Sequence, residues 1–125
     1  MAVEEPRINI DPENWKEFLQ AFAIRNNDRR ARFEVFRSNG QVEEEDKEAR
    51  LEDVLLRDAG QAKNIEIIRI DRGDKNAEKV RDTITNVRGV TIQYDLDGSE
   101  GALEITDSEE SLISLRFESK IDGAS

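Results

Sequence analysis

The 125-residue sequence contains no cysteine and no histidine. The missing cysteines exclude disulfides, thiolate chemistry and cysteine-bound zinc, and the missing histidines remove the commonest general base and metal ligand. No apolar run approaches the roughly 18 residues of a transmembrane helix, and the first residues lack the basic and apolar regions of a signal peptide. We therefore expect a cytoplasmic protein that is not an enzyme and needs no cofactor.

Acidic residues outnumber basic ones by 29 to 19, which gives a formal net charge of −10. Such a charge repels nucleic-acid backbones and anionic membrane surfaces alike, so we expect neither as a partner. Leu, Ile, Val and Phe make up about a quarter of the residues, which is above the roughly one-fifth below which a chain is typically disordered. We expect residues 1–125 to fold as one domain with a single core.

The clearest local pattern predicts a helix over residues 11–25. Asp11 and Pro12 suit its start, because aspartate is a favoured N-cap and proline at the first helical position loses no hydrogen bond. Apolar residues then recur with helical spacing on one face, namely Trp15, Phe18, Leu19 and Phe22. This stripe predicts a helix that is buried against a sheet. Trp15 is expected in the core or, as the alternative, at the wall of a ligand pocket, since the N–H of a tryptophan seeks a partner.

Beyond Arg25 the apolar spacing changes from helical to alternating, as in residues 31–36 and 112–117. Asn39-Gly40 between two such runs is a strong hairpin signal, residues 58–63 read as a loop, and the other connections are too short for parallel crossovers. We predict an α+β fold in which the N-terminal helix packs on an antiparallel sheet of about six or seven strands. The strands should lie within residues 30–118, with the sheet curled toward a partly open barrel and a frayed tail at residues 119–125.

Several of these residues also carry a family resemblance. They are Ile8, Trp15, Phe18 and Phe22 near the start, Phe33-Glu34-Val35 in the first alternating run, and the closing runs 102–105 and 112–117. This arrangement resembles a family of small bacterial proteins described only as a domain of unknown function, over roughly residues 8–118. The resemblance implies a bacterial origin and the family's fold. It implies no activity, cofactor or catalytic residue.

Charge is concentrated in residues 41–58, where Glu43, Glu44, Glu45 and Asp46 are consecutive. These acids follow a predicted hairpin whose first strand is rich in arginine. One interpretation is that the acids pair with those arginines across a solvated face. The other is that they dock on a basic partner, where charge would raise the association rate.

A second acidic segment spans residues 95–104. Asp95, Asp97 and Glu104 fall on ligand positions of the EF-hand loop, but Gln93 occupies its first position. The flanking residues read as strands, whereas an EF-hand requires helices. A hairpin turn is the favoured interpretation, and weak Ca²⁺ binding by these oxygen ligands is the alternative.

The sequence leaves two hypotheses of function. The first is a non-catalytic, soluble interaction or regulatory module that contacts an unidentified protein through an exposed sheet face or its acidic surface, Glu43 to Asp46. The second is a domain that binds a small ligand or Ca²⁺, near Trp15 or at residues 95–104. Both are compatible with a homodimer, because an uncovered edge strand can pair with its own copy.

Overall fold

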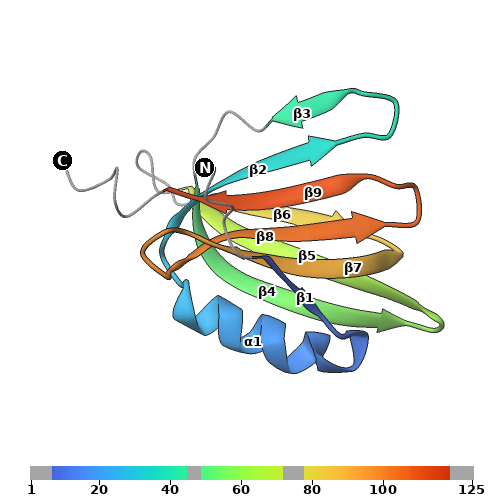
Figure 1. Cartoon of the computed structure of the whole chain (residues 1–125), viewed down its shortest axis with the longest axis horizontal. Helices are drawn as coiled ribbons and strands as arrows, with labels where there is room; N and C mark the ends of the chain where they lie inside the picture. Colours follow the sequence, from blue (N-terminus) through green and yellow to red (C-terminus); the bar gives the residue numbers. More distant parts are fainter. Residues whose placement is uncertain (1–6, 45–48, 72–77, 119–125) are drawn as a thin grey trace, which may run out of the picture.

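The structure is a computed structural model that describes residues 7–44, 49–71 and 78–118. Within these ranges nine strands form one antiparallel sheet, and a 3₁₀ turn and one α-helix lie between the first two strands (Figure 1). The strands are β1 (Arg7–Ile10), β2 (Arg30–Phe36), β3 (Val42–Glu44), β4 (Ala49–Ala59), β5 (Ala62–Asp71), β6 (Glu78–Ile84), β7 (Val87–Tyr94), β8 (Glu100–Asp107) and β9 (Leu112–Phe117). The 3₁₀ turn η1 spans Pro12–Asn14 and the helix α1 spans Trp15–Arg25.

Strand β2 is the point at which the sheet divides. The strand order is β1-β7-β8-β9-β2-β4-β5-β6, and β3 pairs with β2 outside this path. The start of β2 pairs with β4 and its end pairs with β3, while β9 pairs with the other edge of β2 along its length. Figure 1 shows β4, β5 and β6 lying behind β7, β8 and β9, with α1 beside β4. Both halves of the sheet contribute to one core.

The predicted helix on an antiparallel sheet is confirmed in outline, but the expected count of six or seven strands is wrong. β1 was missed because it has only four residues and precedes the helix. The predicted loop at residues 58–63 is also wrong, because β4 and β5 extend to a tight turn at Gly60, whose φ of +70° suits glycine. The hairpin at Asn39-Gly40 is confirmed between β2 and β3. The sheet does not close, and the tail at 119–125 lies outside the described residues.

The start of the helix also differs from the prediction. The side chain of Asp11 makes no capping hydrogen bond; its backbone oxygen accepts one from the N–H of Asn14 at 2.8 Å, which closes the 3₁₀ turn. The α-helix therefore begins at Trp15, with eleven residues. No helix in the described ranges is long and apolar enough to cross a membrane.

The apolar stripe of α1 packs into the core as its spacing predicts. Leu19 and Phe22 are fully buried, and the ring of Phe22 lies 5.7 Å from that of Phe117 on β9 and 6.0 Å from that of Phe18. Trp15 is 3% exposed and its indole N–H donates to the carbonyl of Ile10 at 2.9 Å. This bond joins the start of the helix to the end of β1, and α1 also packs against β4 in the other half of the sheet.

The other end of the helix is held by an ion pair with β8. Arg25 donates two hydrogen bonds to the carboxylate of Glu100, at 2.8 and 2.9 Å, and the amide of Asn26 donates a third at 3.1 Å. Burial of Glu100 acts to raise its carboxyl pKa, but the hydrogen bonds from Arg25 and Asn26 outweigh it and hold this pKa below its ordinary value. The charged form of Glu100 therefore stabilises the docked helix.

The packing of Phe22 yields the first prediction. Phe22→Ala should lower the free energy of unfolding by about 3–5 kcal/mol, because it removes a fully buried ring from the core. Ile24→Ala serves as the control on the same helix, since Ile24 is 78% exposed, and it should change this energy by less than about 0.5 kcal/mol. Urea denaturation measures both. Equal effects of the two changes would contradict the described face of the helix.

The second prediction concerns Glu100 and pH. A carboxyl whose pKa is lower in the folded chain stabilises the fold above its unfolded pKa, and the contribution is lost as the pH falls through the folded pKa. Glu100→Gln should therefore cost about 2 kcal/mol at pH 7, and this difference from the wild type should shrink below about pH 4.3. Urea midpoints between pH 7 and 3 measure it. Glu17→Gln, on the exposed side of α1, is the control, and a difference for Glu100→Gln that stays constant with pH would contradict the assignment.

Candidate functional site

A cleft of about 390 Å³ lies between the end of β2 and the start of β9 on one side and the end of β6 on the other. We call it the β2/β6 cleft. Its floor consists of apolar core residues, namely Phe33, Val35, Ile84 and Ile113. The alternation of β2 turns Phe33 and Val35 inward, and the register with β9 places Ile113 opposite Val35. The turns after β6 and β8 complete the wall at this end of the sheet.

The rim of the cleft carries more negative than positive charge. Its charged residues are Arg37, Glu43, Asp82, Asp107 and Glu109. Arg37 is held by Glu43, with its Nη2 3.1 Å from Glu43 Oε2. The carboxylate of Asp107 accepts hydrogen bonds from the backbone N–H groups of Glu109 and Ser111, at 3.0 and 2.9 Å, which fixes the turn between β8 and β9. An apolar floor under carboxylates suits a cation on an aliphatic stem.

A buried ion pair lies at the edge of this cleft. Arg69 on β5 has no exposed side-chain surface, and its Nη2 is 3.1 Å from the Oδ2 of Asp82 on β6. Nη1 of Arg69 donates to the carbonyl of Ala31 at 3.3 Å, and the guanidinium lies 5.4 Å from the ring centroid of Phe33. Because the Asp82 side chain is 21% exposed and lines the cleft, the pair joins the core to the cleft wall.

Sequence reasoning missed both members of this pair. A signal was present for Arg69, which interrupts the isoleucine-rich run at residues 65–70. An arginine on the buried face of a strand needs a partner, because its desolvation is costly. The sequence offered no means to select Asp82 from 29 acidic residues. In the structure, the β5–β6 register places Asp82 opposite Ile67. Because Ile67 is two residues before Arg69 on β5, Asp82 lies on the same face of the sheet as Arg69.

The predicted acidic surface is only partly described. Glu43 and Glu44 lie exposed on β3, whereas Glu45 and Asp46 are outside the described residues. Glu43 lines the cleft and pairs with Arg37, which is one instance of the predicted pairing between these acids and the arginines of the preceding strand. Glu44 lies opposite Glu34 of β2. The acids thus belong to two environments, one at the cleft rim and one on the outer face.

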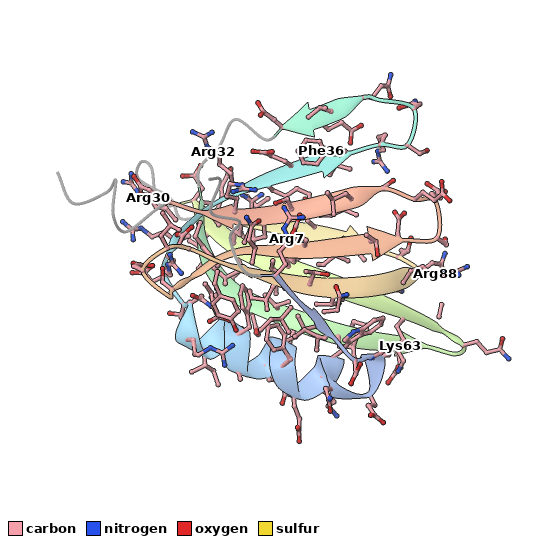
Figure 2. The ribbon with its side chains drawn as sticks, viewed as in Figure 1. Arg7, Arg30, Arg32, Phe36, Lys63 and Arg88 are labelled. Atoms are coloured by element: carbon pink, nitrogen blue, oxygen red, sulfur yellow. The ribbon has the colours of Figure 1, made fainter. Side chains whose placement is uncertain are left out.

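Trp15, the predicted pocket residue, borders a separate hollow of about 610 Å³ at the opposite end of the helix from Glu100. Lys63 and Arg88 also line this hollow, and Figure 2 shows their side chains at the ends of neighbouring hairpins. Almost all of the Trp15 surface is buried in the core and its N–H is bonded to Ile10. Little of the Trp15 side chain is therefore left for a ligand.

The three acids of the predicted Ca²⁺ loop are not gathered around one point. Glu104 lies on β8 and pairs with Arg7 at 3.6 Å, while the carboxylate of Asp97 accepts hydrogen bonds from the N–H and O–H of Ser99 at 3.0 and 2.6 Å. In the described part of the chain, no three acidic side chains form a group that could hold a metal ion. The segment that contains Asp95 and Asp97 forms a turn between β7 and β8, as the favoured interpretation predicted.

The Arg69–Asp82 pair yields the third prediction. Asp82→Ala should lower the free energy of unfolding by about 3 kcal/mol, because it leaves the buried guanidinium without this carboxylate. The double change Arg69→Met with Asp82→Ala should recover much of that loss, since a methionine fills similar space without a charge. Urea denaturation of Asp82→Ala, Arg69→Met and the double variant measures the coupling free energy between the two side chains. Losses that simply add in the double variant would show that the pair is not coupled.

The comparisons with known proteins give no further guide to this site. No family model matches the sequence, and neither the curated proteins nor the solved structures gave a match. The resemblance to the bacterial family of unknown function therefore stays a prediction.

Proposed function

We propose that the protein is a non-catalytic interaction module that binds a basic segment of a partner protein, with one lysine or arginine side chain of the partner in the β2/β6 cleft. The observation that carries this proposal is the combination of an apolar floor with a rim of carboxylates that includes Glu43. Lysine and arginine bury their methylene stems on apolar surface and keep the charged head in a polar environment. In the cleft, the carboxylates supply the polar environment, and the floor residues, which are largely buried, supply a small apolar surface.

Charge supports the proposal at two ranges. Close to the cleft, Glu43 is paired with Arg37 and Asp82 with Arg69, and the carboxylates of Asp107 and Glu109 add further negative charge to the rim. At longer range, the net charge of −10 attracts basic partners and raises their association rate, in a way that salt screens. The acidic character of the whole chain and the local chemistry of the cleft therefore favour the same class of partner.

The size of the cleft also supports a second candidate, a domain that binds a small organic amine. A volume of about 390 Å³ lies within the roughly 300–1,000 Å³ that is typical of small-ligand sites. A free amine would use the same floor and the same carboxylates. The two candidates differ in whether the cation is carried by a polypeptide, which the following experiment separates.

The fourth prediction tests the rim. A labelled hexalysine peptide should bind the protein at low salt, and the double variant Glu43→Gln/Glu109→Gln should bind it about tenfold more weakly, because each exposed ion pair contributes up to about 1 kcal/mol. Glu13→Gln/Glu17→Gln is the control: it has the same net charge, and its two sites lie exposed on η1 and α1, away from the cleft. Fluorescence anisotropy measures the affinities.

Two results would contradict the proposal. Equal weakening in the rim variant and the control would show that hexalysine responds only to net charge. Binding of free cadaverine as tight as that of hexalysine would favour the small-amine candidate instead. If hexalysine affinity no longer depends on salt in the rim variant but still does in the control, the result would support the role of the cleft carboxylates.

A further inference from the structure

Strand β6 forms one wall of the β2/β6 cleft and is also one end of the sheet. It is the last strand in the strand order, and all of its residues, Glu78–Ile84, pair with β5. Within the described residues, no strand pairs with the other edge of β6. An edge strand presents a row of unpaired backbone N–H and C=O groups, to which an extended segment can add as a further strand.

The cleft runs along this edge. Three consecutive strand residues, Asp82, Thr83 and Ile84, line the cleft on the β6 side, and the turn residues 85 and 86 continue it. Successive side chains of a strand point to opposite faces. Three residues in a row can therefore border one hollow only where that hollow meets the edge of the strand. The free edge of β6 and the acidic cleft are thus one continuous surface.

The alternation of β6 determines which side chains of an added strand would face the cleft. Ile84 belongs to the core, so Asp82, two residues earlier, shares its inward face. Lys79, Arg81 and Thr83 lie on the outer face. An added strand has the same alternation, because neighbouring strands of a sheet share their two faces. Its inward side chains would lie beside Asp82, on the side of the cleft, and its outward side chains would lie beside Lys79 and Arg81.

A second copy of β6 fits this edge poorly. In a symmetric antiparallel pair, the residue on the two-fold axis faces its own copy, and the residues on either side of it face each other. An axis at Arg81 sets two arginines opposite each other, and an axis at Asp82 sets two aspartates opposite each other. An axis at Val80 sets Lys79 opposite Arg81. Like charges directly opposite in a sheet are destabilising, so the middle of β6 favours a different chain.

We propose that the basic segment of the partner binds as an added strand on the free edge of β6, with lysine or arginine at every second position and uncharged residues between them. This inference rests on the proposed function and adds the conformation and spacing of the partner. The carboxylates at the cleft complement the inward cations. On the outer side, Lys79 and Arg81 repel further cations, and each is already paired with a glutamate. Main-chain hydrogen bonds would provide affinity, and the alternate side chains specificity.

The first test compares two labelled hexapeptides of identical composition and charge. One alternates lysine and threonine, and its block isomer has three lysines followed by three threonines. Fluorescence anisotropy at low salt should show at least fivefold tighter binding of the alternating peptide. Methylating the backbone nitrogens of either its lysines or its threonines should weaken binding at least tenfold for one set and less than threefold for the other. Only alternate residues of a strand direct their backbone groups toward a given neighbour.

Hydrogen exchange then locates the peptide on the protein. With the alternating peptide at saturation, every second amide of β6 should exchange at least tenfold more slowly, because these N–H groups gain acceptors. The matched control is β1, Arg7–Ile10, which lies at the other end of the strand order. Its amides should change their exchange rates by less than threefold, because the cleft does not border this strand.

Three results would overturn the added strand. They are equal affinities of the two isomers, equal effects of the two methylation sets, and protection of β1 in place of β6. If hexalysine is still weakened by Glu43→Gln/Glu109→Gln beyond its control, the proposed function holds without the added strand. Protection of β6 that rises with protein concentration in the absence of peptide would show a second copy at this edge, and would also overturn the inference.

Discussion

The pairing of β2 with three different strands is the constraint on which the rest of the structure depends. One edge of β2 is used along its length by β9, and the other edge is shared between β4 at its start and β3 at its end. The pairing between β4 and β2 ends at Ala31, and the sheet opens at this point. Beyond it, β4, β5 and β6 face the other half of the sheet across a common core. The cleft lies where this second half diverges from β2, and the buried side chains of Phe33 and Val35 contribute to its floor.

The sequence was informative wherever one periodic pattern decided the outcome. The apolar spacing from Trp15 to Phe22 predicted the buried face of α1, and Asn39-Gly40 predicted the β2–β3 hairpin. It was uninformative where tertiary contacts decide. A strand as short as β1 forms because β7 provides a partner of complementary register, which lies some eighty residues away. Pattern analysis reads local order only, so it could predict neither this pairing nor the division of the sheet at β2.

The same limit explains what was predicted of the candidate site. The acidic run drew attention to Glu43 because consecutive acids stand out in a sequence. Its partner surface is built from single residues of β2, β6 and the β8–β9 turn, each unremarkable in its own segment. Arg69 and Asp82 are thirteen residues apart, and only the β5–β6 register makes their proximity evident. A run of consecutive acids can be recognised in the sequence alone. A site assembled from residues that are distant in the sequence can be recognised only in the folded structure.

The cleft depends on the register of β2. Its inward residues provide Phe33 and Val35 for the floor, and its outward residues include Arg30 and Arg32. Side chains alternate with a period of two, so a slip of one residue against β9 would move the arginines into the core and the apolar residues to the surface. The desolvation of these guanidiniums would make such a slip costly. The outward arginines therefore help to hold β2 in the register that forms the floor of the cleft.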